Sequence, residues 1–419
     1  MTTIGDIGNR IHAFEVFGDY FAFVPSTMDL FGLSRSSYLQ LKNGLEKDRT
    51  LIEGYEYVSI EIAELRALAK APESRYREVA IVDEVTLCMF LTHACNLSCE
   101  YCFDDSARRK YGNSSLQLDN AFKTIEDILN QKDNMNVWFF GGEPLLEFHK
   151  IKRIVAYCQD KVKENPRKKI GYMITTNGLL LNTEIVNFLE RYNFAVTLSM
   201  DDCDKEDETI GKNNADLLQM LIPRQERIML TLRPTVTRDR FRNTRDMFWR
   251  FRKKGVKNVL ICPAFDKECK ASLSQEDAKL FMKQLQKIIG EVIASGNRED
   301  IQAFMLLSDY FFHIKNKIIR EQHCGAGKYI FALDVDGQYY PCQRYASKEL
   351  KAISEIKCSP SSSSIVCREC WAYPLCGGNS CSFNKDIKIK DNRGFCFLNK
   401  SMIELACWAY SKVMDQGLL

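Results

Sequence analysis

Three cysteines spaced C-x3-C-x2-C stand directly after a run of apolar residues, and they constrain the fold more than any other feature of the chain. They are Cys95, Cys99 and Cys102, and the apolar run is 85–91. Three thiolates hold three irons of a cubane cluster and leave the fourth iron open, whereas electron carriers use four cysteines. A zinc site missing one ligand is the alternative, but such sites usually pair two C-x2-C units. The pattern therefore favours an iron-sulfur cluster with one open iron at the end of a buried strand.

Short apolar runs alternate with longer helical patterns from residue 85 onwards. This alternation is typical of an α/β fold in which helices join parallel strands. Parallel barrels bind ligands at the carboxyl ends of their strands, so we expect the site there. The predicted strands are 85–91, 137–140, 170–175, 195–200, 228–235 and 259–262, and a helical stretch follows over 275–319.

Glycines and polar side chains end several of the later strands. Gly141-Gly142-Glu143-Pro144 follows 137–140, where glycines permit close backbone approach and a carboxylate can accept a hydrogen bond from an ammonium group. Arg233 lies in an apolar strand, where an unpaired guanidinium would be costly, so we expect it to meet an anion or to form a structural ion pair. Three further candidates at strand ends, each of which could also be a simple turn residue, are Asn177, Ser199 and Asp201.

Residues 1–80 predict a small separate domain of three strands followed by helices. The aromatic-rich runs 14–17 and 20–25 flank Gly18-Asp19 and predict a hairpin, with a third strand over 28–33. A helix over 36–45 is capped by the serines at 34–37, and apolar spacing predicts a second helix over 60–68. Such a domain could bind a partner or could be a structural cap on the barrel.

The overall composition is that of an ordinary globular protein. At 419 residues the chain can form two or three domains, and its net charge of +3 comes from interspersed acids and bases, which does not favour nucleic acid or a membrane surface. The start lacks the apolar core of a signal peptide, and no apolar run approaches the length of a membrane span. We therefore expect a cytoplasmic protein whose 17 cysteines bind metal rather than form disulfides.

A second group of cysteines lies in the C-terminal region. Asp336-Gly337 predicts a hairpin turn that brings Cys324 and Cys342 together, and Cys367-x2-Cys370-x5-Cys376-x4-Cys381 is followed by Cys396. We expect these cysteines to bind metal, and zinc is one candidate. The other cysteines are interpreted as small core residues, and they are Cys88, Cys158, Cys203, Cys262, Cys269 and Cys407.

The three-cysteine loop, with Tyr101 before its third cysteine, and the Gly-Gly-Glu-Pro motif resemble the signatures of the radical S-adenosylmethionine (SAM) enzymes. This resemblance implies a partial (β/α)6 barrel, assigned here with its bridging helices to 81–320, in which SAM chelates the open iron of the catalytic cluster held by Cys95, Cys99 and Cys102. It also implies SAM contacts from a set of strand-end residues, namely Tyr101, Gly141, Gly142, Glu143, Asn177, Ser199, Asp201 and Arg233.

The C-terminal cysteines resemble the SPASM domain of radical SAM maturases, assigned here to 321–419. The resemblance implies two auxiliary [4Fe-4S] clusters. The first would be held by Cys324, Cys342 and Cys381, and the second by Cys367, Cys370, Cys376 and Cys396. The last spacing is x4 where the usual pattern has x3, and the first cluster has only three obvious ligands. Its fourth iron could be open, or bound by Cys358 or a non-cysteine group.

The order of strands and helices in 1–80 resembles the winged-helix-like recognition domain of enzymes that modify ribosomally made peptides. The whole chain resembles thioether-forming ranthipeptide synthases of the PapB type. This implies intramolecular thioether crosslinks between a cysteine sulfur and a side-chain carbon, made through hydrogen abstraction by a 5′-deoxyadenosyl radical. The implied partners are a cysteine-containing precursor peptide with a leader and a flavodoxin- or ferredoxin-type reductant.

Three alternative functions stay open from the sequence. The first is a formylglycine-forming sulfatase maturase, against which the N-terminal domain argues because a sulfatase motif needs no leader-binding module. The second is a peptide epimerase, and the third is a noncatalytic peptide-binding iron-sulfur protein.

Overall fold

The computed structural model of the protein describes residues 11–47, 84–201, 206–207, 212–264, 273–320, 324–348, 353, 367, 370–378 and 393–418. Several predictions fall outside these residues. They are the helix over 60–68, the boundary between 80 and 81, and the positions of Cys203, Cys269, Cys358 and Cys381.

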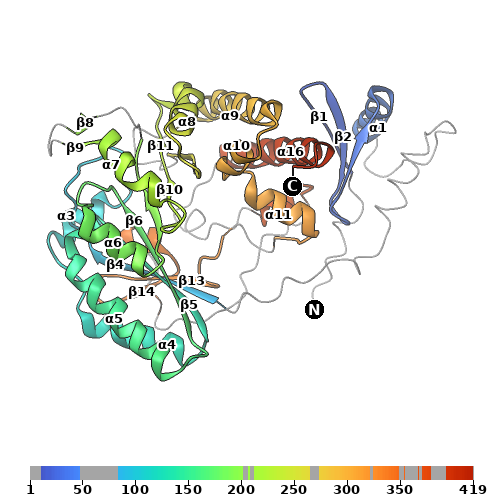
Figure 1. Ribbon diagram of the computed structural model, residues 1–419. Coiled ribbons are helices and arrows are strands. Elements are labelled where there is room, and N and C mark those ends of the chain that lie inside the picture. Colours follow the sequence, from blue (N-terminus) through green and yellow to red (C-terminus); the bar gives the residue numbers. More distant parts are fainter. Residues whose placement is uncertain are drawn as a thin grey trace.

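A seven-stranded sheet of order β10-β7-β6-β5-β4-β13-β14 forms the centre of the fold (Figure 1). Its first five strands along the chain are parallel and neighbour one another in chain order, which agrees with the predicted strand-helix units. The strands are β4 (Glu84–Thr92), β5 (Asn134–Gly141), β6 (Lys169–Thr176), β7 (Ala195–Leu198), β10 (Thr231–Leu232), β13 (Ile330–Leu333) and β14 (Tyr339–Tyr340). The helices between them are α3 (Asp105–Tyr111), α4 (Leu118–Leu129), α5 (Phe148–Glu164), α6 (Thr183–Arg191) and α7 (Asn214–Leu221).

Strand β4 is apolar almost throughout because both of its faces are buried. Leu87 and Met89 pack in the core between the sheet and the helices, and Cys88 and Phe90 pack in a second core on the opposite face. Successive strand residues point to opposite faces, so a run without polar residues identifies a strand that is covered on both sides.

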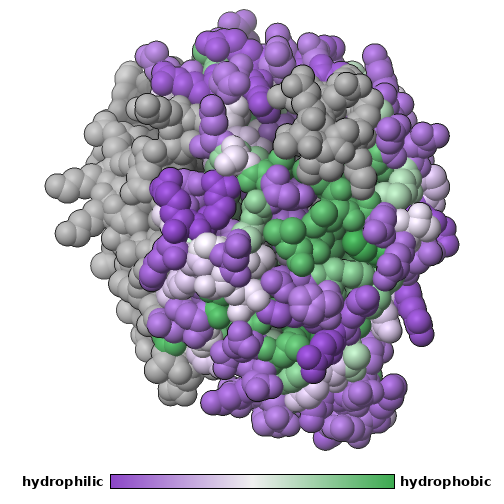
Figure 2. Space-filling model, turned by 90° about the vertical axis from the view of Figure 1, so that its left-hand side faces the viewer, coloured by the Kyte–Doolittle hydropathy of each residue, from purple (hydrophilic) through white to green (hydrophobic). Residues whose placement is uncertain are grey.

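On the side of the molecule that carries α3 and α7, apolar residues gather on the surface among hydrophilic ones (Figure 2).

Three of the predicted strands are shorter than their apolar runs. Strand β7 ends at Leu198, before the end of the predicted strand 195–200. The run 228–235 contains β10 and β11 (Thr235–Val236), whereas Ile228 and Leu230 are buried within and just after a turn before β10. The run 259–262 contributes β12 (Cys262–Pro263), which pairs in parallel with β11, and Val259 forms an isolated bridge to Leu232. The prediction was wrong at 228–230 because burial alone does not distinguish a packed turn from a strand.

The hairpin β13–β14 joins the central sheet beside β4. Strand β13 is parallel to β4 and antiparallel to β14, and the turn between the two hairpin strands contains Asp336 and Gly337 with Gly337 at φ +81°. The Gly327 N–H donates to the Pro341 carbonyl at 2.9 Å, so the chain next to Cys324 lies against the chain next to Cys342. The predicted hairpin is confirmed, and it extends the central sheet.

Strands β1 (His12–Val16), β2 (Asp19–Val24) and β3 (Asp29–Leu33) form a separate antiparallel sheet, followed by α1 (Arg35–Lys47). The Ser34 hydroxyl accepts the Ser37 N–H at 3.1 Å, which confirms the predicted cap. The predicted turn was displaced by one residue, because Phe17 and Gly18 occupy it with φ of +53° and +84°. Phe17 tolerates this conformation because its ring packs against Trp408 and Gly290.

The N-terminal sheet packs against the C-terminal helix α16 (Arg393–Asp415), and Figure 1 shows β1 and β2 beside it. The His12 ring stacks on Trp371 with centroids 3.5 Å apart, and its Nε2 lies 2.8 Å from an oxygen of Glu404. Asp19 accepts a hydrogen bond from Trp408 Nε1 at 3.0 Å and pairs with Lys412 at 2.9 Å. The first and last described parts of the chain are therefore fixed to each other.

The predicted helical stretch over 275–319 is confirmed by three helices, α9 (Gln275–Ser295), α10 (Arg298–Ala303) and α11 (Ser308–Asn316).

No helix in the part of the chain described by the structure is long and apolar enough to cross a membrane. The remaining helices are α8 (Thr244–Lys253), α12 (Gln343–Lys348) and α14 (Tyr373–Cys376), and a two-residue strand pair is formed by β8 (Glu206–Asp207) and β9 (Lys212–Asn213).

Candidate functional site

The three cysteines of the first motif lie in the loop between β4 and α3, which we call the cluster loop (95–104). All three thiols are partly buried, and burial raises their pKa values, that of Cys102 to about 11. The charges of Asp104, Cys99 and Cys95 also raise the pKa of Cys102, and its N–H donates to the Cys99 carbonyl at 3.1 Å. Thiolates at this position therefore need a positive partner, which a metal cluster supplies.

The Gly-Gly-Glu motif packs against the backbone at the end of β4. The Gly142 N–H donates to the Thr92 carbonyl and the Glu143 N–H to the Ala94 carbonyl, both at 2.8 Å. A Cβ on Gly141 would lie 2.1 Å from the Thr92 oxygen. The glycines thus permit close approach between two strand ends, which is a structural role in addition to the predicted approach to a cofactor.

We expect Gly142→Ala to destabilise the protein, because the new Cβ would lie 2.2 Å from the carbonyl oxygen of Ala94 and 2.4 Å from that of His93. Both obstacles are backbone atoms that cannot rotate away, so the free energy of unfolding should fall by about 1–3 kcal/mol. Urea unfolding of the purified protein measures this. The matched control is Gly32→Ala, whose Cβ would meet no atom within 4 Å. Equal urea concentrations at the midpoint of unfolding for Gly142→Ala and Gly32→Ala would contradict the packing role of Gly142.

Glu143 is fully buried and joins the ends of β5 and β6. One carboxylate oxygen accepts hydrogen bonds from the Thr176 hydroxyl at 2.7 Å and the Leu145 N–H at 3.0 Å, and the other accepts the Asn177 N–H at 2.8 Å. Burial raises the pKa of this carboxyl to about 7, although the three donors oppose the shift. Its protein contacts hold the strand ends together, and a contact with SAM stays a prediction.

Asn177 connects β6 to the cluster loop. Its side-chain nitrogen donates to the Asn96 side-chain oxygen at 2.8 Å and lies 3.8 Å from the Cys95 sulfur. The side-chain nitrogen of Asn96 is buried and has no hydrogen-bond acceptor among the described residues. A buried donor without an acceptor is costly, so this nitrogen is suited to a ligand that carries negative charge.

Asp201 connects β7 to the cluster loop from the other side. It accepts hydrogen bonds from the Tyr101 hydroxyl at 2.5 Å, the Thr235 N–H at 3.0 Å and Arg240 at 2.8 Å. Burial, followed by the nearby Asp201 charge, raises the pKa of Tyr101, so the phenol stays protonated and donates. A small cavity of about 170 Å³ lies beside Asp201 and Arg240.

Arg233 and Ser199 lie next to each other at the ends of β10 and β7. The Arg233 N–H donates to the Leu198 carbonyl at 2.9 Å, and Ser199 is exposed. The Arg233 guanidinium is half-buried and makes no ion pair or hydrogen bond with the described residues. The predicted structural ion pair is therefore absent from the described part of the chain, and the guanidinium is available for an anion.

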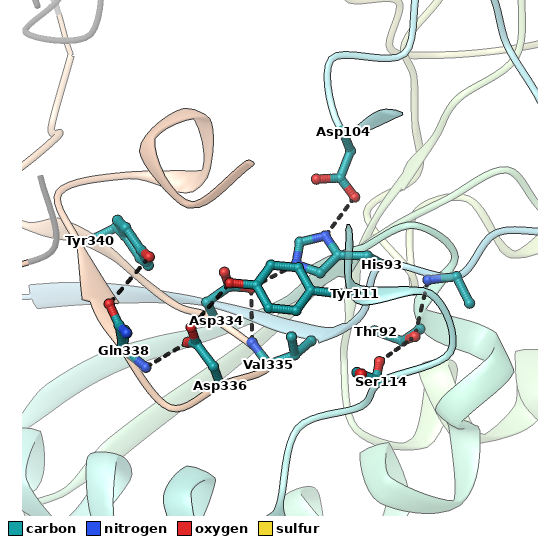
Figure 3. Close-up of polar contacts among 11 residues, drawn as sticks. Thr92, His93, Asp104, Tyr111, Ser114, Asp334, Val335, Asp336, Gln338 and Tyr340 are labelled. Atoms are coloured by element: carbon teal, nitrogen blue, oxygen red, sulfur yellow. Dashed lines mark hydrogen bonds and ion pairs between the residues drawn. The ribbon is translucent and has the colours of Figure 1, made fainter. Parts of the chain in front are cut away.

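A buried histidine network lies beside the cluster loop and was missed by the sequence analysis (Figure 3). His93 is inaccessible to solvent, with Nδ1 2.9 Å from Asp104 and Nε2 2.7 Å from Asp334. Burial lowers the pKa of this imidazole, but the two carboxylates outweigh it and raise the pKa to about 9. The partners are 11 and 241 residues away in the sequence, so no local pattern could have revealed them.

The structure also brings the C-terminal cysteines together. Burial raises the pKa of Cys376 to about 11, and the charges of Cys370, Cys396 and Cys367 act in the same direction. The Cys370 N–H donates to the Cys367 carbonyl at 3.0 Å. Cys342 lies close to Cys88, whose pKa is raised by burial and then by Cys342. Cys88, Cys158 and Cys407 are buried, as predicted for core residues, whereas Cys262 is only partly buried.

The donor sets fit iron-sulfur clusters and SAM. Both cysteine groups consist of thiols alone, and the side-chain nitrogen of Asn96 in the cluster loop is unsatisfied among the described residues. No three His, Cys, Asp or Glu side chains in the described ranges are close enough together to hold a single metal ion. In a cubane cluster each cysteine binds a different iron, so convergence on a single ion is not required.

The central part of the chain matches a family model. Residues 89–273 match the model of the Radical SAM superfamily. The matched region contains the cluster loop and all of the strand-end residues described above.

Relatives with similar sequences include a cyclopropyl synthase and a sulfatase-maturating enzyme. The chain is 32% identical over 128 residues to the radical SAM cyclopropyl synthase TigE of Paramaledivibacter caminithermalis, covering 27% of this chain and about a quarter (26%) of TigE. It is 24% identical over 355 residues to a cysteine-type anaerobic sulfatase-maturating enzyme of Clostridium novyi, covering 74% of this chain and 91% of that enzyme. These relatives are distant homologues.

A solved structure supports the same fold. The structure of anSMEcpe with bound AdoMet and Cp18Cys peptide matches with a TM-score of 0.64 at 20% identity, covering 79% of this chain and 99% of that chain. At this level of identity the match establishes the α/β fold with its parallel sheet and does not establish a shared activity.

Proposed function

We propose that this chain is a radical SAM enzyme that modifies a ribosomally made precursor peptide by joining a cysteine sulfur to a side-chain carbon. The observation that carries the proposal is the packing of a small antiparallel sheet against the cysteine-bearing C-terminal region. His12 in β1 stacks on Trp371, and Trp371 follows Cys370 directly. A peptide held on this sheet would be near a second cysteine group in a chain that also has a radical SAM domain.

The N-terminal sheet offers a peptide only its edges, because both of its faces are covered. Phe14, Phe21 and Phe23 pack into the main core on one face. Ala22, Val24 and Leu41 pack together on the other face, towards α1. A leader peptide can therefore add as a further strand, with backbone hydrogen bonds giving affinity.

The residues of the radical SAM domain have separate tasks in this proposal. SAM and the clusters, when bound, supply the radical chemistry and an acceptor for the electron that thioether formation releases. Cys95, Cys99 and Cys102 would hold the SAM-binding cluster, and Arg233 would pair with the carboxylate of SAM. Tyr101 and Asn177 connect the cluster loop to β7 and β6, so they keep it in place over the strand ends.

The remaining candidate residues are proposed to hold the auxiliary clusters. Cys367, Cys370, Cys376 and Cys396 would bind the second one. The hydrogen bond from the Cys370 N–H to the Cys367 carbonyl at 3.0 Å supports this. Cys324 and Cys342 would bind the first one together with Cys381. Gly141, Gly142, Glu143, Ser199 and Asp201 complete the proposed surroundings of SAM.

The proposal is tested by anaerobic incubation of the cluster-loaded protein with SAM, a reductant and the small cysteine-containing peptide encoded beside it. Peptide mass spectrometry should find a loss of two hydrogens per crosslink, with one cysteine per crosslink no longer alkylatable. One hydrogen leaves as an atom taken from carbon, and the other leaves as the thiol proton together with one released electron. A peptide mass that is unchanged in ordinary water but rises in deuterated water, through uptake of solvent deuterium, would indicate epimerisation. That result would contradict thioether formation.

A sulfatase-maturating activity is the second candidate function, because the Clostridium novyi enzyme aligns with 74% of this chain. Its product would lose the cysteine sulfur and gain a carbonyl oxygen. The same mass spectrometric measurement distinguishes this outcome, since a thioether keeps its sulfur.

A further inference from the structure

Three parts of the chain that are far apart in sequence meet at the side chain of His93. His93 follows the last residue of β4, Asp104 ends the cluster loop, and Asp334 follows the last residue of β13. Asp104 stands at the N-cap position of α3, yet its side chain does not cap that helix and bonds His93 instead. The network therefore holds both ends of the cluster loop and connects them to the hairpin that leads to Cys342.

The surroundings of His93 leave it little freedom. Its ring stacks on Tyr111 with centroids 5.0 Å apart and planes at 15°, and Tyr111 donates its hydroxyl hydrogen bond to Asp336 at 3.1 Å. Asp334 also accepts the Val335 N–H at 2.8 Å, so its own position is fixed by the turn. Figure 3 shows His93 between Asp104 and Asp334, with Tyr111 beside it. A buried imidazole with a carboxylate at each nitrogen is held in one position and one orientation.

We propose that His93 is a positioning residue, which fixes the cluster loop against the β13–β14 hairpin and so sets the placement of the SAM-binding cluster relative to the first auxiliary cluster. The inference rests on the proposed function and assigns to it a residue that is not one of the proposed cysteine ligands. Groups outside the metal ligands that orient them typically change metal affinity by about 10- to 100-fold when they are removed. A fixed separation matters here because the electron released at the peptide has to reach a cluster in the same chain.

The test compares two chemically identical changes in one turn. Asp334→Asn replaces the buried carboxylate that bonds His93, and Asp336→Asn replaces the exposed carboxylate that bonds Tyr111. The signal measured is the part of the electron paramagnetic resonance spectrum of the reduced protein that changes when SAM is added, because only the cluster with the open iron should respond. Signals that do not respond to SAM report the auxiliary clusters in the same sample.

We expect Asp334→Asn to lower by about 10-fold the chelator concentration that removes half of the SAM-responsive signal. The midpoint potential of that signal should shift as well. Asp336→Asn should behave as the wild type, and His93→Leu should lose the SAM-responsive signal. If His93→Leu does not fold, the comparison of Asp334→Asn with Asp336→Asn still tests the positioning role.

Equal chelator sensitivity and equal potential in the two asparagine variants would overturn the positioning role. So would an equal loss of all cluster signals in Asp334→Asn, which would indicate general destabilisation. Absence of any SAM-responsive signal in the wild-type protein would overturn the proposed function itself, and the inference with it.

Discussion

Replacing Cys95, Cys99 or Cys102 by Ala, one at a time, is expected to reduce the SAM cleavage activity to background. Each thiolate binds a separate iron in the proposed cluster, so losing one thiol removes one of the three attachments and leaves a cluster without a defined open iron. The loss should be complete because, in the proposed function, the cluster held by these three cysteines is the one that binds SAM. The measurement is 5′-deoxyadenosine formation under anaerobic conditions with a strong reductant.

The control for this prediction is Cys158→Ala. Cys158 is buried in α5 within the main core, and burial raises the pKa of its thiol to about 12, as expected for a small core residue. This variant should keep full SAM cleavage and lose only some stability. Deoxyadenosine formation by any of the three cluster-loop variants at the wild-type rate would show that the cluster is held elsewhere.

Replacing Gly32 by Pro is expected to abolish modification of a leader-bearing peptide while leaving SAM cleavage intact. Val16 and Asp19 are the paired residues on either side of a two-residue turn, so the backbone of Asp19 hydrogen-bonds to β1. Successive residues of an antiparallel strand bond to neighbours on alternate sides. The residues of β2 whose backbone bonds β3 are therefore Tyr20, Ala22 and Val24. Gly32 lies opposite Phe21, so its N–H should point to the open edge of β3. Among the described residues, this amide has no backbone acceptor outside the sheet.

Proline removes this outward donor and is tolerated on edge strands, so the fold should survive. Leader affinity, measured by fluorescence anisotropy with a labelled leader peptide, should fall at least about 10-fold, since each tenfold corresponds to about 1.4 kcal/mol of binding free energy. Gly32→Ala keeps the N–H and is the matched control, because its Cβ would meet no neighbouring atom within 4 Å. Equal affinity for the proline and alanine variants would exclude the β3 edge as the leader site.

A point substitution is a sharper test of leader binding than deleting residues 1–80. The sequence analysis treats this region as separate, but Phe14, Phe21 and Phe23 belong to the main core. Asp19 and His12 also bond α16. Deletion would expose this apolar surface, so a loss of modification could come from damage to the C-terminal region as easily as from a lost recognition site.

The positions of the strand-end residues could be predicted from the sequence for a simple physical reason. Parallel strands that follow one another in the chain place their carboxyl ends at one edge, so Cys95, Glu143 and Asn177 had to be neighbours. Their hydrogen bonds confirm it. Asp201 reaches the same site through Tyr101, although 100 residues separate the two.

Other features depended on contacts that no local pattern reveals. The turn at Phe17-Gly18 differs from the predicted Gly18-Asp19 because Trp408, at the other end of the chain, packs on the Phe17 ring. The run at 228–230 is apolar because it is buried, but it lies around a turn.

The sequence by itself predicted the parallel strand-helix units and the place of the cluster loop after β4, because cysteine spacing and apolar periodicity are local properties of a chain. Only the tertiary structure decided that Asp334 bonds His93, that the β13–β14 hairpin extends the central sheet, and that the N-terminal sheet rests on α16. These contacts join residues hundreds of positions apart, and their energies depend on burial and geometry that exist only once the chain has folded.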